Sequence, residues 1–431
     1  MGLGLLGRGA GDARFLAECG AELIVTDMKS EEELASSVEP LRVFSNVTLR
    51  LGGHRMEDFE GRDMIIKAAG VPLDSPSIAH ARERGVPIEM STALFTALSG
   101  ATIVGVTGTR GKSSVTHLLY EILHYASTGA EKKVWLGGNV RGVSTLALLP
   151  EVRSGDVAVL ELDSWQLQGF GERHLSPHVA VFTNLMDDHL NYYKGDRARY
   201  LADKQNIFAW QKEGDHVVMG AEIAGELADE TCRVPSELHI VDGTKLPDEW
   251  TTLMKGEHAM RNILLAVEAA RALGVSDDTI REVVASFVGV PGRLECIAKQ
   301  DGVQYYNDTT ATTPDATIAA LRAVGEGRSI VLIMGGADKG LDMTKLVAEL
   351  PHHARAIILL PGTGTDKLAL GSFDGEVVHV GSMREAVETA RATARAGDTV
   401  LLSPGLASFG LFNNEFDRGD QFNAAVQSIE V

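Results

Sequence analysis

A glycine-rich segment carries the strongest chemical signal in the sequence. Gly105–Ser113 reads GVTGTRGKS and stands between an apolar run, Thr102–Val106, and a helix-like segment. Glycines let backbone N–H groups close around phosphate oxygens, and a helix N-terminus adds partial positive charge. Lys112 could reach the terminal phosphates and Ser113 could ligate Mg²⁺, although Val106 stands where a strict P-loop has glycine. The alternative is a glycine turn with a solvated lysine, but the combination of strand, loop, Lys-Ser pair and helix favours a nucleotide site.

Three further residues could complete a site for metal-assisted phosphoryl transfer. Glu161 ends an apolar strand-like run, at the sheet edge where open α/β folds place their ligands, and this is a position for a Mg²⁺ ligand. His189 follows the next such run, although a histidine there is more often a surface or capping residue. Lys204 lies in a helical pattern that by itself favours a packed stem with the ammonium in water.

The elements that must position these residues alternate between strand-like and helix-like runs. Strand-like runs fall within 22–27, 63–67 and 86–89, then 102–106, 157–160 and 178–182, then 303–306, 329–334, 356–360 and 398–402. Helices are expected over 257–273 and 383–395. This alternation predicts an α/β fold with parallel sheets. Breaks near Ser99-Gly100 and Pro291-Gly292 predict three domains, 1–98, 99–297 and 298–431: two Rossmann-like domains around a P-loop ATPase-type domain.

Composition narrows the class of protein. A chain of 431 residues exceeds one hydrophobic core, and 44% apolar with 23% charged residues is typical of globular protein. The apolar runs are too short to cross a membrane and the start lacks a basic leader, so no membrane association or secretion is expected. Cys19, Cys232 and Cys296 form no C-x-x-C pair, and the net charge of −19 opposes nucleic-acid binding. We expect a cytoplasmic monomer.

The motifs resemble those of the Mur ligases of peptidoglycan precursor synthesis along nearly the whole chain. The loop is similar to the family's TGTNGK[ST], with Arg110 in place of asparagine. Gly137–Asn139 matches GGN, and 160–167 is similar to ELSSFQL with Asp163 replacing a serine. Asp188-His189 followed by Lys204 keeps the family's spacing between a metal-ligand histidine and a lysine that becomes carbamylated.

The resemblance therefore reverses the interpretation of Lys204. It implies that ATP is the cofactor and that two Mg²⁺ ions are bound. The implied nucleotide contacts in the loop are Gly108, Thr109, Gly111, Lys112, Ser113 and Ser114. The implied metal ligands are Ser113, Glu161, His189 and a carbamylated Lys204, and Lys112 joins the last three as a catalytic residue.

Further matches extend into the last domain. Residues 257–262 resemble GxHNxxN, 291–295 matches P-[GH]-R-[FL]-E, and 307–313 resembles NDSKATN with Thr310 replacing lysine. The resemblance implies that Asn262, Arg293 and Asp308 contact ATP. Taken singly, Arg293 could be a linker salt bridge and Asp308 could cap the helix after Pro314.

The amino-acid substrate is assigned to two loops, 335–339 and 403–409. By the resemblance, Lys339 pairs with the carboxylate of glutamate, and Ser408 and the backbone N–H of Phe409 donate to it. Asn139 and Thr312 are implied substrate contacts as well. Residues 413–419 depart from the family's KN[FY]ExRG, because the aromatic residue stands one place late.

The N-terminal glycines allow two interpretations. Gly2-x-Gly4-x-x-Gly7 with Asp27 would fit a dinucleotide site, but that motif alone is weak. The resemblance instead implies that UDP binds near Leu5, Leu6 and Gly70, with its uracil near Asp27. The loop over residues 8–12 is about two residues longer than in the family, and almost no strand precedes Gly2, which suggests that the first strand is missing from this chain.

The implied reaction is ATP-dependent ligation of glutamate to UDP-N-acetylmuramoyl-L-alanine through an acyl-phosphate. The residues leave D- and L-glutamate open, and the resemblance favours D-glutamate. Alternatives are a Mur-type ligase that adds L-glutamate, lysine or diaminopimelate, a folylpolyglutamate enzyme, a noncatalytic nucleotide-binding protein, and a nicotinamide dehydrogenase.

Overall fold

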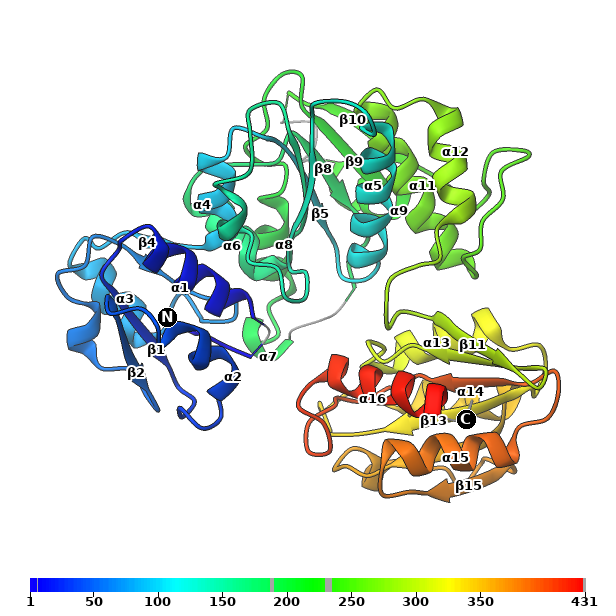
Figure 1. The fold of residues 1–431 in the computed structure, drawn as a ribbon. Helices are drawn as coiled ribbons and strands as arrows, with labels where there is room; N and C mark the ends of the chain where they lie inside the picture. The colour runs from blue at the N-terminus through cyan, green and yellow to red at the C-terminus, as the bar shows by residue number, and fades with distance from the viewer. Residues whose placement is uncertain (6, 187–189, 229–234, 429–431) are drawn as a thin grey trace. The chain divides into compact units, whose positions relative to one another are not determined.

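The structure is a computed structural model that describes residues 1–5, 7–186, 190–228 and 235–428 (Figure 1). The chain divides into two compact units. One unit comprises Met1–Trp250 with Arg261–Ala285, and the other comprises Thr251–Met260 with Ser286–Val431. Among the described residues, no helix is both long enough and apolar enough to cross a membrane.

The N-terminal part of the first unit contains two short parallel strand pairs, β1 with β2 and β3 with β4. The Gly2 amide donates to the Thr26 carbonyl at 2.8 Å and the Ala68 amide donates to the Met1 carbonyl at 2.8 Å, so the first residues join the two pairs. The elements here are α1 (Arg8–Glu18), β1 (Leu23–Asp27), α2 (Ala35–Val38), η1 (Glu39–Leu41), β2 (Val47–Leu51), η2 (Met56–Phe59), β3 (Ile65–Ile66), α3 (Pro76–Glu83), β4 (Ile88–Glu89) and α4 (Ser91–Leu98).

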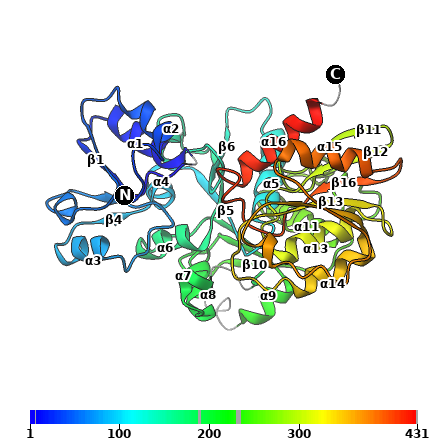
Figure 2. The ribbon, with the colours of Figure 1, turned by 90° about the horizontal axis from the view of Figure 1, so that it is seen from below.

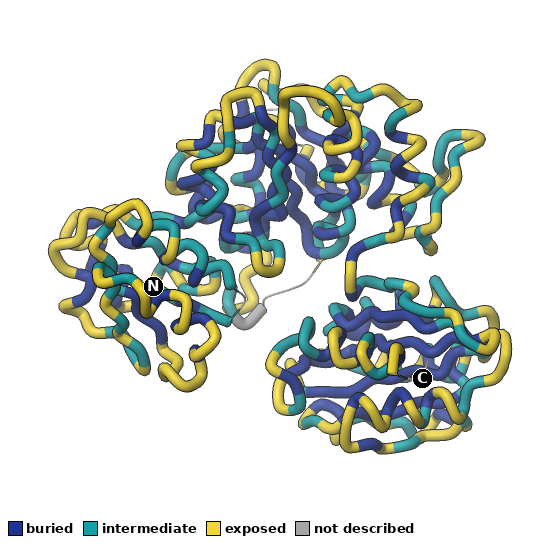
Figure 3. Tube along the Cα trace, in the orientation of Figure 1, coloured by how far each residue is buried: buried dark blue, intermediate teal, exposed yellow. Residues whose placement is uncertain are grey.

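The rest of the first unit is built on a parallel six-stranded sheet in the order β10-β9-β8-β5-β7-β6. Its inner strands are apolar on both faces, which is typical of parallel strands covered by helices, and they form the buried centre of this unit (Figure 3). The elements are β5 (Thr102–Thr107), α5 (Lys112–Ala126), β6 (Val134–Gly138), η3 (Leu146–Leu148), β7 (Val157–Glu161), α6 (Ser164–Glu172), β8 (Val179–Phe182), α7 (Leu190–Tyr193), α8 (Arg197–Gln205), β9 (His216–Gly220), α9 (Ala221–Glu226), β10 (Glu237–Val241), α11 (Glu257–Ala272) and α12 (Asp277–Ser286).

The second unit has a mixed sheet in the order β11-β12-β16-β13-β14-β15, in which β11 alone runs antiparallel. Alternate residues of β13 enter two different cores: Val331 and Ile333 pack with α15 and α16, whereas Leu332 and Met334 pack with α13 and α14 (Figures 1 and 2). The elements are β11 (Glu295–Gln300), β12 (Val303–Asn307), α13 (Pro314–Val324), β13 (Ile330–Gly335), α14 (Thr344–His353), β14 (Ala354–Leu360), η4 (Thr365–Lys367), β15 (Glu376–His379), α15 (Met383–Thr393), β16 (Thr399–Leu402) and α16 (Glu415–Gln427).

The predicted fold class is confirmed, but the strand list was incomplete and one loop was wrong. The sequence interpretation missed six strands, β2, β6, β9, β10, β11 and β15. Three of these, β2, β10 and β15, carry polar residues on exposed positions and therefore lack a continuous apolar run. Residues 8–12 are not a lengthened loop, because α1 begins at Arg8, directly after its N-cap residue Gly7. The predicted domain boundaries remain predictions.

Candidate active site

The glycine-rich loop joins β5 to α5 as predicted, and two of its glycines have no room for a side chain. Gly108 has φ +138°, and a Cβ there would lie 1.9 Å from Thr183 Oγ1. Gly111 has φ +81° and precedes the first residue of α5, and its Cβ would lie 2.3 Å from Asn262 Oδ1. Only glycine fits this backbone path, which ends at a helix N-terminus, so the segment has the geometry of a phosphate-binding loop.

Two lysines reach the same carbonyl of this loop. Lys112 Nζ donates to the Gly108 carbonyl at 3.1 Å and to the Thr109 carbonyl at 3.0 Å. Lys204 Nζ, from α8, donates to the Gly108 carbonyl at 2.8 Å and is only 2% exposed as a residue. The interpretation from helix pattern alone, with the Lys204 ammonium in water, is therefore wrong. Its amine lies beside the loop where phosphate would bind.

Ser113 and Glu161 form the acidic side of the site. Ser113 Oγ donates to Glu161 Oε2 at 2.5 Å, and both residues are buried. Asn139 Nδ2 donates to Glu161 Oε1 at 3.2 Å, and Arg8 of α1 contacts the Asn139 side-chain oxygen. These contacts follow from the sheet order, because β7 lies between β5 and β6 and its carboxyl end meets theirs.

The loop is supported from its other side by residues that the sequence interpretation missed. Asn184 Oδ1 accepts from the Arg110 amide at 2.9 Å, and Thr183 Oγ1 donates to the Arg110 carbonyl at 2.6 Å. Thr109 Oγ1 accepts from the Met186 amide at 2.9 Å and contacts the Tyr200 hydroxyl at 3.1 Å. For Thr183 and Asn184 a usable signal was their position directly after the apolar run of β8, the strand next to β5.

Two more predicted nucleotide contacts lie in the same unit. Asn262, on α11, is 9% exposed and its amide lies against Gly111, so the structure brings it to the loop. Ser114 lies in the first turn of α5 and is half-buried. His189 lies outside the described residues.

The residues present fit a magnesium ion. A serine hydroxyl and a carboxylate that already share a hydrogen bond are hard oxygen donors, which Mg²⁺ prefers. Lys204 as an amine offers no such oxygen, whereas a carbamate on the same nitrogen would offer two. Its position beside the Gly108 carbonyl places that nitrogen at the loop.

In the second unit, Asp308 is buried and held by two donors. Its Oδ1 accepts from the Leu294 amide at 3.0 Å and its Oδ2 accepts from Ser403 Oγ at 2.8 Å. Burial raises the pKa of this carboxyl to about 7, against the opposing effects of Ser403, the Leu294 amide and the charge of Arg293. Asp308 is not the cap of α13, because the residue before that helix is Thr313. The charge of Arg293 lowers the pKa of the Asp308 carboxyl, so these two predicted ATP contacts interact electrostatically.

The predicted amino-acid loops follow β13 and β16, which pair with each other. Lys339 is exposed, and its Nζ donates to Thr312 Oγ1 at 3.0 Å, so two predicted contacts are brought together. Ser408 is buried beside Ala407, which bridges to Ala337, whereas Phe409 is 64% exposed.

Arg418 links the segment after β12 to the loop after β16, and the sequence interpretation did not include it among the site residues. It is fully buried, and its guanidinium donates to the Thr309 carbonyl at 2.8 Å and to the Leu406 carbonyl at 3.2 Å. Burial lowers its pKa to about 10, with Glu415 opposing. The Arg-Gly pair at 418–419 was the available signal.

The predicted uridine site has one clear feature. Asp27 ends β1 and is 8% exposed; its Oδ2 accepts from the Gly4 amide at 3.1 Å and its Oδ1 from the Lys29 amide at 2.9 Å. Leu5 is half-buried next to this turn and Gly70 is exposed after β3. Leu6 lies outside the described residues. Through these contacts Asp27 holds Gly4 next to the end of β1.

Three segments match known family descriptions. Residues 1–89 match the Mur ligase MurD-like N-terminal domain, 106–234 the Mur ligase middle domain, and 292–406 the Mur ligase glutamate ligase domain. The chain is 37% identical to a UDP-N-acetylmuramoylalanine–D-glutamate ligase of Roseiflexus sp., covering 100% of this chain and 98% of the relative. A Geobacillus kaustophilus protein of the same name is 33% identical over 99% and 97% of the two chains. The chain therefore belongs to the Mur ligase family.

Solved structures show the same fold. The UDP-N-acetylmuramate–alanine ligase of Thermotoga maritima aligns over 99% of this chain and 98% of its own, with a TM-score of 0.65 and 20% identity. A MurF ligase from Thermotoga maritima, solved in complex with ADP, aligns over 95% and 96% with a TM-score of 0.58 and 17% identity. These likenesses establish the fold.

Proposed function

We propose that this protein uses ATP to join D-glutamate to UDP-N-acetylmuramoyl-L-alanine, releasing ADP and phosphate. The observation that carries the proposal is the similarity along the whole chain to relatives that bear the name of this D-glutamate ligase. The reaction needs activation because a carboxylate and an amine do not condense in water at a useful rate. Attack of the alanyl carboxylate on the γ-phosphate gives an acyl-phosphate and ADP; the glutamate amine then attacks the carbonyl, loses a proton, and phosphate leaves.

The phosphate loop is the proposed place of the first step. Backbone amides of Gly108 and Gly111 would surround phosphate oxygens. Thr109, whose own amide donates to the Asn184 carbonyl at 2.9 Å, would border the nucleotide together with Ser114 and Asn262. Lys112 lies at the loop with its ammonium already held by two carbonyls, so it would exchange these contacts for the transferred phosphoryl group. A cation held in this position offsets the negative charge that develops in the transition state.

Ser113, Glu161, His189 and a carbamylated Lys204 are the proposed holders of two Mg²⁺ ions. The bound ions would supply positive charge to the phosphoryl oxygens. A carbamate changes the sign of charge at Lys204, whose amine is buried beside the loop and would otherwise repel a nearby cation. Asn139 keeps Glu161 oriented through its side-chain amide.

The remaining proposed roles divide between the other loops. Leu5, Leu6, Asp27 and Gly70 would bind the UDP part of the precursor. Thr312, Lys339, Ser408 and Phe409 would bind glutamate. Arg293 and Asp308 are the other proposed ATP contacts. We also propose the boundaries 1–98, 99–297 and 298–431, a monomer, and a cytoplasmic location, where ATP and nucleotide-linked precursors are available.

A substrate panel tests the proposal. Phosphate release and product mass would be measured with ATP, UDP-N-acetylmuramoyl-L-alanine and, separately, D-glutamate, L-glutamate, L-lysine and meso-diaminopimelate. We expect D-glutamate to give both phosphate and an amide product of the summed mass. A faster reaction with another amino acid would identify a different Mur-type ligase, and phosphate release without any amide would contradict ligation.

A further inference from the structure

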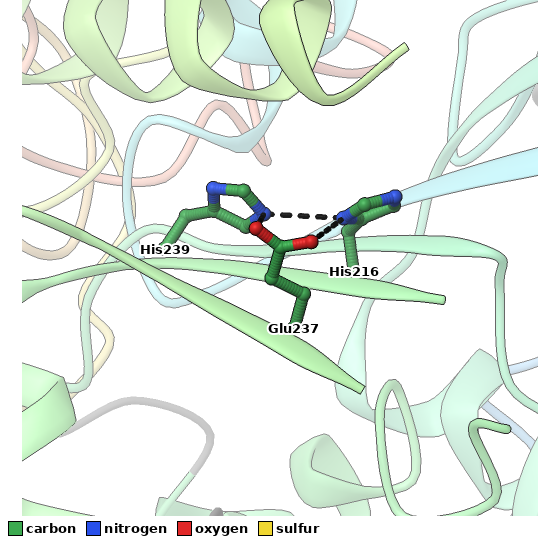
Figure 4. Close-up of side chains that lie close together, drawn as sticks. All are labelled: His216, Glu237 and His239. Carbon is green, nitrogen blue, oxygen red and sulfur yellow. Dashed lines mark hydrogen bonds and ion pairs between the residues drawn. The ribbon is translucent and has the colours of Figure 1, made fainter. Parts of the chain in front are cut away.

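A cluster of two histidines and a glutamate lies at the edge of the central sheet (Figure 4). His216 begins β9, and Glu237 and His239 stand two residues apart on the neighbouring edge strand β10. Because side chains two residues apart share a face of a strand, Glu237 and His239 lie on one face. The parallel pairing places Glu237 opposite His216, which brings the three side chains together.

The separations of the donor atoms match those around a small metal ion. His216 Nδ1 and His239 Nε2 are 3.1 Å apart, and the two carboxylate oxygens of Glu237 lie 3.7 Å and 3.8 Å from these nitrogens. A tetrahedral ion with metal–nitrogen bonds of about 2.0–2.1 Å places its ligand atoms about 3.3 Å apart. The observed distances fall on both sides of that value, so small side-chain rotations would bring all three atoms to the ion.

A fourth residue orients one of the histidines. Glu268, on α11, has its Oε1 3.2 Å from His239 Nδ1. With the proton on Nδ1 and shared with this carboxylate, His239 Nε2 presents a lone pair to the cluster. A carboxylate behind a ligand histidine is the usual outer partner in protein zinc sites.

We propose that His216, Glu237 and His239 form a binding site for a transition-metal ion of the zinc class, separate from the magnesium site proposed at the phosphate loop. Imidazole nitrogens together with one carboxylate favour Zn²⁺, Co²⁺ or Ni²⁺, whereas Mg²⁺ prefers oxygen ligands throughout. Three protein ligands leave a position for water. The ion would tie the edge strand β10 to β9 and, through Glu268, to α11.

Cobalt and zinc titrations of the full-length protein test this site. They would be run with millimolar Mg²⁺ to occupy oxygen-ligand positions, and with a chromophoric chelator to measure zinc affinity. We expect one Co²⁺ equivalent with a visible d–d band typical of a four-coordinate ion, displaced by Zn²⁺. His216→Ala and His239→Ala should each weaken binding by at least ~100-fold, because losing a ligand costs more than losing an outer partner.

Two further variants sharpen the result. Glu268→Gln keeps the shape of the outer partner but removes its charge, and should weaken zinc binding by roughly 10- to 100-fold without loss of the cobalt band. The control His352→Ala/His353→Ala removes two histidines from α14 and should bind the metal as the unchanged protein does. Undiminished binding in the His216 and His239 variants, or no binding at micromolar zinc, would overturn the proposal.

Discussion

The glycine-rich loop proposed to bind phosphate, in the first unit, and the loops proposed to bind the amino acid, in the second unit, are built in opposite ways. Both follow buried parallel strands. Around the phosphate loop, however, Ser113, Glu161 and Lys204 are buried and bonded to one another or to the backbone. In the second unit, Lys339 and Phe409 project from exposed loops.

This difference in burial suits the two regions to different roles, one in stabilising the transition state and the other in binding the substrate. Buried charges that the chain itself holds in place are preorganised, which favours stabilising a transition state. An exposed cation on a loop keeps its water until a ligand arrives, and its contribution is mainly to binding and selectivity. Substitutions in the first region should therefore lower turnover, and substitutions in the second should raise the KM for one substrate.

The largest expected effect is that of Lys112→Ala, which should lower turnover by at least ~10³-fold, because its charge would act on the transferred phosphoryl group. Steady-state phosphate release at saturating ATP measures it. Lys132→Ala, an exposed lysine outside the loop, is the control. A loss of less than tenfold would remove Lys112 from the phosphoryl-transfer step.

Lys204→Ala should lower turnover nearly as much as Lys112→Ala does, but in Lys204→Ala a small added carboxylic acid should restore part of the rate. If the lysine acts as a carbamate, acetate or formate in the space left by the short side chain would restore the negative charge and part of the rate. The rate with and without added acid is the measurement, and Lys212→Ala is the control. A variant that keeps most of its activity without acid would make Lys204 structural.

In the first unit, the sequence predicted which residues form the site better than it predicted which of them are buried. Strand, glycine loop and Lys-Ser pair are local patterns, so Gly108 to Ser113 could be found directly. The burial of Lys204 could not, because its helix pattern matches a surface lysine and its burial depends on contact with a loop 96 residues away. Thr183 and Asn184 were missed for the same reason, since only the sheet order brings them under the loop.

In the second unit the sequence predicted the central strands, but it did not predict the edge strand β11 or the contacts of Arg418. The apolar runs of β13, β14 and β16 identified the central strands, whereas β11 was missed because its apolar stretch is only three residues long and none of its residues is buried. Arg418 shows the same limit: the Arg-Gly pair marks the residue, but its contacts with the carbonyls of Thr309 and Leu406 depend on the fold.

A smaller effect is expected for the exposed region. Lys339→Ala should raise the KM for glutamate about tenfold or more while leaving the KM for ATP nearly unchanged, because the lost charge would pair with the amino acid's carboxylate. Initial rates with each substrate varied in turn measure the two constants. Lys345→Ala, a nearby exposed lysine on α14, should change neither. Equal shifts in both constants would indicate a structural role for Lys339.

The smallest effect concerns the pH dependence of stability. Because burial raises the pKa of Asp308 to about 7, the folded protein keeps a proton that the unfolded chain has lost. The resulting stabilisation is present at low pH and is lost as the pH rises through 7, with a slope of at most about 1.4 kcal/mol per pH unit. Asp308→Asn should flatten the dependence of the denaturation midpoint on pH between about pH 4 and pH 7, whereas the exposed Asp315→Asn should not. An unchanged slope in Asp308→Asn would contradict this.

The central claim, ligation through an acyl-phosphate formed at the phosphate loop, is tested most directly by isotope transfer. UDP-N-acetylmuramoyl-L-alanine labelled with ¹⁸O in its alanyl carboxylate would be converted with ATP and D-glutamate, and the released phosphate analysed by mass. Attack of the carboxylate on the γ-phosphate predicts phosphate that carries one labelled oxygen and an amide that keeps the other. Unlabelled phosphate together with amide product would contradict the acyl-phosphate.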